Sequence, residues 1–399
     1  MSLHACQPFC QQCRIPFDCA SRASCPVLPE PAANAWAELF VTPKSPAPQS
    51  PQVAKGATMT KPRFDVLTIG NAIVDIIAPI SPGFLEREGM QKGIMHLIDE
   101  SRAESLYAKM PLQKQQISGG SAANTAAGVA SLGGRAAFVG KVNDDVLGDF
   151  FANDLAAAGV HYQTQRLRNG EATARSMILI TPDGERTMNT YLGACHQLTE
   201  ADIDEHQIGA ATITFMEGFL WDPPEAKKAF LKAAHYAHKH GRTVAFTLSD
   251  PFCVSRYRNE FLELIRSGTV DVLLANIHEL LSLYQTGDLR DAVRQLKENV
   301  PLAAVTMGSD GAMAVRRNEE VSISAYPVAK VVDVTGAGDL FASGFLLGIS
   351  TGLDPAKALR LGCSSASEVI THIGARPEAN LEIYVKRQGI LDAPLPLAL

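Results

Sequence analysis

The sequence VVDVTGAGDLFASGFLLGI, residues 331–349, joins a β-type run to a long apolar helical run. The junction consists of the very small residues Gly336, Ala337 and Gly338. Asp339 is the only charged residue of the helical part. A helix that begins near Gly336 leaves the N–H groups of the junction unpaired, at the positive end of the helix dipole. The junction therefore predicts an anion site, beside which Asp339 is either a helix cap or a carboxylate that accepts a proton.

Around this stretch, short apolar runs rich in β-branched residues alternate with helical patterns that end in glycine. This alternation is typical of βαβ units around a mostly parallel sheet, so we expect an α/β sandwich. The predicted strands are FDVLTIG (64–70), AAFVGKV (136–142), ATITFMEG (211–218), TVAFTLS (243–249), VDVLLAN (270–276) and LAAVTM (302–307). The predicted helices lie within residues 121–133, 146–159, 223–241 and 254–268.

Two segments break the alternation, KGIMHLID (92–99) and TARSMILITPDGERTMNTYLG (173–193). The second alternates polar and apolar residues around a Pro-Asp-Gly turn, which favours a hairpin. We expect a small second sheet, built from segments near 90–120 and 163–192, that forms a lid over a site at the strand ends of the main sheet.

The composition is that of a globular protein, with 46% hydrophobic and 20% charged residues and a formal net charge of -6. This charge argues against a nucleic-acid or anionic membrane surface, so we expect small-molecule partners. Neither an apolar run of about 18 residues nor a signal-peptide pattern is present, which predicts a cytoplasmic protein. The sequence leaves a monomer or a homodimer open.

The N-terminal region differs in composition from the rest of the chain, since five of the eight cysteines and nine of the 23 prolines lie before residue 52. We expect residues 1–58 to be a disordered extension, with Met59 as a candidate natural start. Cys10 and Cys13 form a CxxC that could seed a zinc site, although a second CxxC is missing. The main domain is then expected at residues 59–390, followed by a tail at 391–399.

A second glycine-containing junction is ISGGSAANTAAG, residues 117–128. Gly119 and Gly120 would let a ligand approach the backbone closely, and Ser121 or Asn124 could contact its hydroxyl groups. The alternative is a serine helix cap with ordinary packing. None of the glycine-rich segments fits a Walker A loop or a dinucleotide fingerprint, because Val142 follows Gly140-Lys141 and Phe341 replaces the third glycine after Gly338.

Two further polar pairs stand beside predicted strands. Asn71 and Asp75 in GNAIVDI could bind vicinal hydroxyls, with a turn role as the alternative for Asn71. Asn276 and Glu279 in LLANIHEL share a helix face and could hold a hydrated Mg²⁺ or a nucleotide phosphate. As an isolated pair they would form a helix cap and its capping-box acid.

Together, GNAIVD, GGSAAN, NIHE and TGAGD resemble the PfkB, or ribokinase-like, family of carbohydrate and nucleoside kinases from Phe64 to about Arg387. The resemblance implies a three-layer α/β/α sandwich with a central sheet of about eight or nine strands and a β-sheet lid. It implies that Asp339 is the general base, that residues 336–338 form the anion hole, and that Asn276 and Glu279 organise Mg²⁺ and phosphate. ATP is then the phosphoryl donor. A monovalent cation such as K⁺ near Asp333 is left open.

Within that family, EGFLWDPPE, GERTMNTYLGA and HIGARP look most like the adenosine-kinase branch. This resemblance places a ribose between Asp75 and Asn124 and the adenosine 5′-hydroxyl beside Asp339. Phe219 or Trp221 would stack on a base, with strand-end packing as the alternative. Arg186 would help to neutralise the transferred phosphate, and the nucleotide-side neighbours would be Thr306, Gly308 and Gly311. A sugar kinase acting on ribose, fructose or a sugar acid, and a nucleoside-binding sensor without turnover, are the competing interpretations.

Overall fold

The computed structural model describes residues 62–390. The predicted extension at 1–58, its CxxC and the tail at 391–399 lie outside the described residues. Within residues 62–390, no helix combines the length and the apolar character needed to cross a membrane. The same part of the chain contains no cluster of three or more His, Cys, Asp or Glu residues suited to a metal ion.

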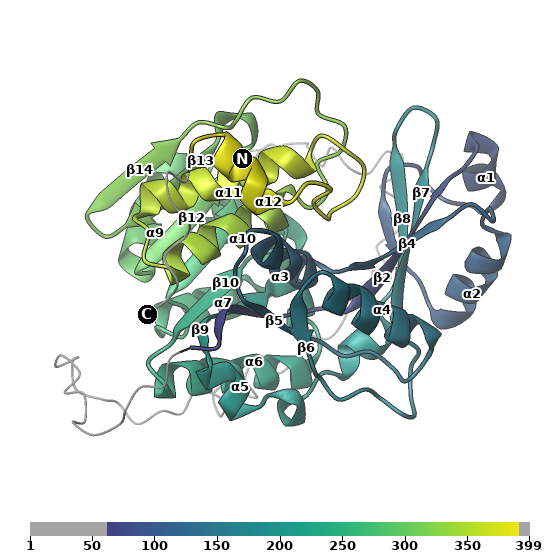
Figure 1. The fold of residues 1–399 in the computed structure, drawn as a ribbon, viewed down its shortest axis with the longest axis horizontal. Helices are drawn as coiled ribbons and strands as arrows, with labels where there is room; N and C mark the ends of the chain where they lie inside the picture. The colour runs from purple at the N-terminus through teal and green to yellow at the C-terminus, as the bar shows by residue number, and fades with distance from the viewer. Residues whose placement is uncertain (1–61, 391–399) are drawn as a thin grey trace, which may run out of the picture. The chain divides into compact units, whose positions relative to one another are not determined.

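The main sheet has nine strands in the order β14-β13-β12-β11-β10-β9-β1-β5-β6 (Figure 1). All neighbours from β12 to β6 pair in parallel, whereas β13 and β14 form an antiparallel edge. The strands are β1 (Phe64–Ile69), β5 (Ala136–Val139), β6 (Val160–Tyr162), β9 (Ala211–Glu217), β10 (Thr243–Thr247), β11 (Val272–Asn276), β12 (Leu302–Thr306), β13 (Ala312–Arg316) and β14 (Glu319–Ile323). The predicted mostly parallel α/β sandwich is confirmed.

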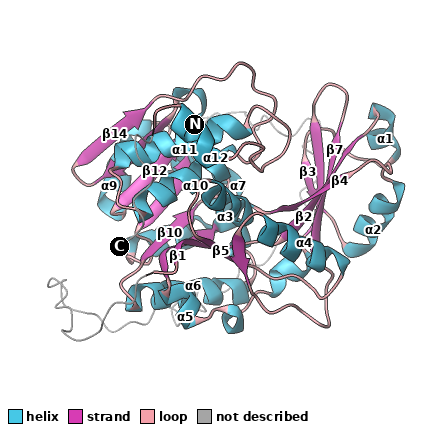
Figure 2. Ribbon diagram, in the orientation of Figure 1, coloured by secondary structure: helices cyan, strands magenta, loops and turns pink. Residues whose placement is uncertain are grey.

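Helices cover both faces of this sheet (Figure 2). One face carries α3 (Ser121–Ser131), α10 (Ala337–Ser350) and α11 (Pro355–Val369), with α12 (Leu381–Arg387) packed against α3 and α11. The other face carries α5 (Glu205–Gly209), α6 (Pro224–Lys239), α8 (Ile277–Tyr284) and α9 (Leu289–Asn299), with α7 (Pro251–Arg266) packed against α8.

Alternation along the strands explains why the sheet is buried on both sides. In β1, Val66 joins the apolar core of one face, while Leu67 and Ile69 join the core of the other. Side chains of a strand point alternately to opposite faces, so apolar residues on both faces of β1 fit a sheet covered by helices on both sides.

A second, smaller sheet has five strands in the order β3-β8-β7-β2-β4. Its strands are β2 (Ile73–Pro79), β3 (Met95–Leu97), β4 (Gln115–Gly119), β7 (Ala174–Ile180) and β8 (Arg186–Tyr191). Near them lie α1 (Pro82–Arg87), α2 (Glu100–Lys109) and α4 (Val146–Ala157). The hairpin predicted around the Pro-Asp-Gly turn is present as β7 and β8, and β2 is a strand that the sequence reading did not separate from β1.

The β-type run predicted at residues 331–334 is wrong, because these residues form no strand. Instead, the amides of Val332 and Asp333 donate to the carbonyl oxygen of Ile370, at 2.8 and 3.4 Å. Val334 is 68% exposed. β-Branched residues favour strands only where a neighbouring strand and a packing surface are available, and this segment has neither.

Candidate active site

Asp339 lies in the first turn of α10 and is held from α3. The Ser121 hydroxyl donates to Oδ1 of Asp339 at 2.6 Å, and the Asn124 amide donates to Oδ2 at 2.9 Å. Burial raises the pKa of Asp339 above its ordinary value, and the two hydrogen bonds oppose that shift. A carboxylate with a raised pKa and a fixed orientation is suited to accept a proton near neutral pH.

The junction before α10 differs in one respect from the prediction. Gly336 is the N-cap and adopts φ +79°, a conformation that favours glycine, and a side chain there would meet Ala375 at 2.6 Å. The Ala337 amide donates to the carbonyl of Val334 at 3.2 Å, so it is not unpaired as expected. Gly338 faces open space, since a Cβ added there would meet no atom within 4 Å.

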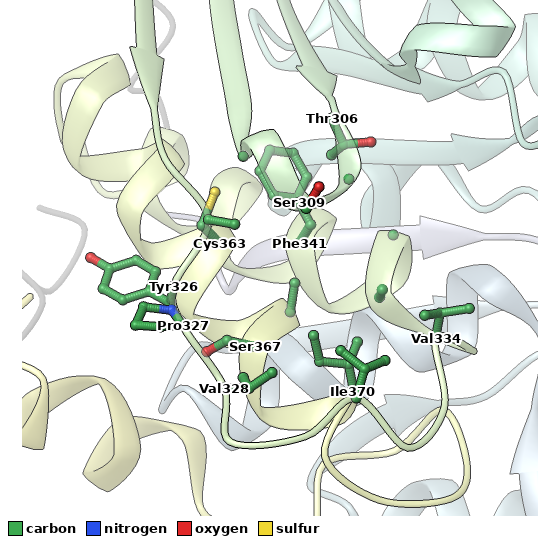
Figure 3. Close-up of a pocket in the computed structure, with 17 residues that line it drawn as sticks. Thr306, Ser309, Tyr326, Pro327, Val328, Val334, Phe341, Cys363, Ser367 and Ile370 are labelled. Carbon is green, nitrogen blue, oxygen red and sulfur yellow. The ribbon is translucent and has the colours of Figure 1, made fainter.

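A cavity of about 610 Å³ lies beside this junction (Figure 3). Its walls are mainly apolar, with Tyr326, Val328 and Ile370 at one end. The lining also includes the three residues predicted on the nucleotide side, Thr306, Gly308 and Gly311. A large apolar cavity with a few polar groups suits a flat heterocyclic ligand.

A second cavity of about 260 Å³ contains Asp339 and continues from the first, because Thr306, Gly338 and Phe341 line both. Ser121, Asn276, Glu279, Ser249 and Phe219 also line it. This space runs from the larger cavity to the candidate base.

Asn276 and Glu279 form a capping box at the start of α8. Asn276 Oδ1 accepts from the Glu279 amide at 2.9 Å, and Glu279 Oε2 accepts from the Asn276 amide at 2.9 Å. Burial raises the pKa of Glu279 to about 7, and the nearby Asp250 adds to that shift. The cap interpretation is therefore correct, yet the same carboxylate lines the cavity of Asp339.

A small recess of about 10 Å³ is lined by Asn124 together with Asp75, Ser118, Arg186 and Arg376. Burial raises the pKa of Asp75 to about 7; Arg376 and Arg186 lower it, while Asp339 raises it further. Asn124 belongs to this recess and also contacts Asp339, so it connects the predicted acceptor residues to the base.

A groove of about 680 Å³ adjoins the recess and shares Ile77, Ile117, Gly374 and Arg376 with it. Further apolar residues of the groove are Pro79, Ile180, Ile373 and Pro377. The recess brings Asp75, Asn124 and Arg376 together beside apolar side chains, and the groove combines its apolar residues with Gln113, Lys114 and Gln115. The two together suit a ligand with a polyhydroxylated part and a larger, less polar part.

Glycine is required at positions 119 and 120 because other atoms of the protein lie very close to both residues. A Cβ at Gly119 would lie 2.2 Å from Oδ2 of Asp75. Gly120 adopts φ +97°, and a Cβ there would lie 2.1 Å from the carbonyl oxygen of Asn71. These glycines let β4 and the start of α3 pass close to Asp75 of β2 and to the loop of Asn71 that precedes it.

Comparisons with known proteins identify relatives of this chain. The model of the pfkB family carbohydrate kinases matches residues 98–381. The chain belongs to the pfkB family. A structure described as a probable sugar kinase from Rhizobium etli is 51% identical, covers 83% of this chain and 100% of its own, and has a TM-score of 0.77. The structure of adenosine kinase from Sinorhizobium meliloti is 52% identical, covers 82% and 99%, and has a TM-score of 0.76. A curated 5-dehydro-2-deoxygluconokinase from Clostridium perfringens is 27% identical over 78% of this chain and 88% of its own length.

One polar residue of this pfkB kinase was missed in the sequence, Glu217 at the end of β9. Its side chain is fully buried, and Oε1 accepts from the backbone and side-chain amides of Asn71, both at 2.7 Å. Oε2 accepts from the Ala122 amide at 2.7 Å. Glu217 thus fixes the loop after β1 and the start of α3, the helix that supplies Ser121 and Asn124. Asn71 lies outside the described cavities and contacts Glu217, which favours its turn role.

The two aromatic residues predicted to stack on a base, Phe219 and Trp221, lie in different environments. Trp221 is 2% exposed and packs against Phe230, Phe246 and Phe261, so the strand-end packing alternative is correct for it. Phe219 is 42% exposed and lines the cavity of Asp339, not the recess of Asp75.

Arg186 reaches the loop before α10 rather than an open phosphate position. It forms an ion pair with Asp333, and its Nη1 donates to the Thr335 hydroxyl at 2.8 Å. The carboxylate of Asp333 also accepts from the amides of Thr335 and Gly374, at 3.0 and 2.8 Å. Because these donors already occupy Asp333, its carboxylate does not fit a site for a monovalent cation.

Proposed function

We infer that this pfkB kinase transfers the γ-phosphoryl group of ATP to the 5′-hydroxyl of a nucleoside, with adenosine as acceptor and AMP as product. The observation that carries the inference is the continuity between the recess that contains Asp75, Asn124 and Arg376 and the larger groove beside it. The recess itself has a volume of only about 10 Å³, so a ribose would lie at its mouth with its hydroxyl groups directed towards Asp75, and the base would lie along the groove. The 52% identity to the Sinorhizobium meliloti adenosine kinase supports the same substrate.

In the proposed reaction, Asp75 accepts hydrogen bonds from the ribose hydroxyls, and Asn124 orients the sugar towards Asp339. Asp339 accepts the proton of the 5′-hydroxyl as its oxygen attacks the γ-phosphorus and the bond to the β-phosphate oxygen breaks, releasing ADP. The Gly336 and Gly338 amides at the positive end of α10 stabilise the charge of the transferred group.

Asn276 and Glu279 offer oxygen ligands of the kind that Mg²⁺ takes through its water shell, and Glu279 lines the cavity of Asp339. Mg²⁺ bound with ATP would neutralise phosphate charge there. Positioning and electrostatics carry the rest of the chemistry, as is usual for phosphoryl transfer without a covalent nucleophile.

A second candidate is a sugar kinase, because two of the relatives above carry sugar-kinase names. The test offers the purified protein ATP and Mg²⁺ with adenosine, inosine, ribose or fructose, and measures ADP release and product mass. We expect AMP from adenosine. Phosphorylation of a free sugar alone would replace the nucleoside assignment, and ADP release with any acceptor would exclude a nucleoside-binding sensor.

A further inference from the structure

Arg376 lies in the acceptor recess and is held by a single neighbour. Its Nε and Nη2 donate to the carbonyl oxygen of Ser118 at 3.0 and 2.8 Å, and Nη2 also donates to the Ser118 hydroxyl at 2.9 Å. Asp154 of α4 accepts from the Ser118 amide at 2.9 Å and from its hydroxyl at 2.5 Å. This chain fixes the guanidinium plane, because a planar fork with two engaged nitrogens has little freedom left.

The remaining nitrogen of Arg376, Nη1, is buried and has no hydrogen-bond partner among residues 62–390. In the same recess, Asn124 Oδ1 is buried and unpartnered within that part of the chain, although its Nδ2 is engaged by Asp339. Asp75 completes the set, since its pKa is governed by burial and by nearby charges rather than by a protein hydrogen-bond donor. Buried polar atoms without partners are uncommon in native proteins, so one donor and one acceptor in one recess point to a ligand.

The charges around the recess decide which ligand fits. Three carboxylates act on Arg376 from different elements, namely Asp154 of α4, Asp75 of β2 and Asp339 of α10. Burial lowers the pKa of Arg376 to about 10, which leaves it cationic at neutral pH, and its charge in turn lowers the pKa of Asp75 and Asp339. The nearby Arg186 is already paired with Asp333. The positive charge of Arg376 is therefore balanced by the protein itself, and a substrate carboxylate would add uncompensated negative charge.

We propose that Arg376 is a specificity-determining residue of the acceptor site, whose Nη1 donates to an uncharged acceptor atom of a polyhydroxylated substrate, so that neutral nucleosides or sugars are selected against sugar acids. The proposal rests on the kinase function assigned above and on the recess of Asp75 as its acceptor side. The substrate class follows from complementarity. Asp75 and Asn124 Oδ1 require hydroxyl donors, whereas Arg376 Nη1 requires a ring oxygen, a hydroxyl oxygen or a ring nitrogen.

The experiment compares Arg376→Met, which removes the charge and the donors, with Arg376→Lys, which keeps a charge but loses the forked contact with Ser118. Arg166→Met is the matched control, because Arg166 pairs with Asp149 away from the described cavities. Steady-state kinetics use ATP with adenosine, ribose or gluconate, and binding of a non-hydrolysable ATP analogue confirms that each variant is folded. If Arg376→Met does not fold, the comparison of Arg376→Lys with the wild type still tests the proposal.

For Arg376→Met we expect a rise of roughly 10- to 100-fold in the KM for the neutral acceptor, as for a lost hydrogen bond to a charged group. The acidic limb of its kcat/KM profile should move to higher pH, because the cation no longer favours ionised Asp75 and Asp339. In Arg376→Lys the acidic limb should lie at the wild-type pH, because the positive charge is kept, but the KM for the neutral acceptor should remain raised. The proposal would be overturned if both variants kept the wild-type KM and the wild-type acidic limb. It would also be overturned if the wild type phosphorylated gluconate and Arg376→Met abolished that activity. Failure of the wild type to release ADP with any acceptor would instead overturn the proposed function.

Discussion

Asn124 Nδ2 lies 2.9 Å from Oδ2 of Asp339, so a single amide links the recess of Asp75 to the candidate general base. Asp339→Asn should lower kcat by roughly 10² to 10⁴ while nucleoside binding is retained, because the amide keeps the shape but cannot accept the proton. Single-turnover kinetics and equilibrium binding of adenosine separate the two effects.

The matched control is Asp354→Asn at the exposed start of α11, where Asp354 caps the helix by accepting from the Lys357 amide. Asparagine is an equally good cap, so this variant should behave as the wild type. Turnover of Asp339→Asn within about threefold of the wild type would remove Asp339 from the role of base.

The pH dependence of activity follows from Asp75 and Asp339. Burial raises the pKa of both, for Asp75 to about 7, and each must be ionised to act. Activity should therefore be low at acid pH, rise as the pH increases through about 7, and then level off. A kcat/KM profile that stays flat down to a pH of about 5.5 would contradict this assignment.

The same shift has a consequence for stability. Because the native pKa of Asp75 lies above its unfolded value, the native state binds more protons between about pH 4 and pH 7, and stability is lost as the pH rises through that window. Asp75→Asn should therefore increase the free energy of unfolding at a pH of about 8 relative to the wild type, and much less at a pH of about 4. Denaturant unfolding at the two pH values measures the difference.

Glu217 provides the test of a residue that touches no described cavity but holds two site segments. Glu217→Gln replaces one carboxylate oxygen by an amide group that faces another donor, either Asn71 or the Ala122 amide. We expect a loss of about 1–3 kcal/mol in unfolding free energy, together with a lower kcat because α3 is displaced. Glu225→Gln, at the exposed pair of Glu225 with Lys228, is the control and should have little effect. Wild-type stability and kcat in Glu217→Gln would argue against this positioning role.

The sequence predicted those parts of the site whose chemistry is local. TGAGD and GGSAAN each place small residues, a helix start and a polar side chain within a few positions, so the two helix starts could be inferred without distant contacts. The role of Glu217 could not be predicted, because its partner Asn71 is 146 positions away in the chain. In the sequence, an acidic residue at the end of a strand also resembles an exposed residue. The position of Arg376 could not be predicted either, since nothing near it in HIGARP indicates that Ser118 and Asp75 surround it.

The ion pair between Arg186 and Asp333 leads to a prediction about cations. The guanidinium, the Gly374 amide and the amide and hydroxyl of Thr335 already satisfy the Asp333 carboxylate, so a bound monovalent cation has little to gain there. Replacing KCl by tetramethylammonium chloride at constant ionic strength should change kcat and both KM values by less than about twofold. A loss of tenfold or more, restored by K⁺ but not by Na⁺, would show that a selective cation site exists and that the Asp333 environment rearranges.

Gly119 offers a test of the recess that leaves its charged groups in place. A methyl group at Gly119 would lie 2.2 Å from Oδ2 of Asp75, so Gly119→Ala must push that carboxylate or β4 aside. We expect the KM for the acceptor to rise at least about tenfold, because hydrogen bonds to the substrate hydroxyls depend on the position of Asp75.

The KM for ATP should change by less than about twofold in this variant, since Gly119 does not line the cavity of Thr306, Gly308 and Gly311, which we propose as the ATP site. Gly287→Ala is the matched control, because Gly287 has open space around the position of a Cβ and no positive φ. It should leave all kinetic constants unchanged and stabilise the protein slightly, by about 0.4–1 kcal/mol. Equal effects of Gly119→Ala on the KM for ATP and for the acceptor would indicate a general disturbance of the domain. An unchanged KM for the acceptor would show that Asp75 does not bind it, because the added methyl group cannot coexist with the present position of that carboxylate.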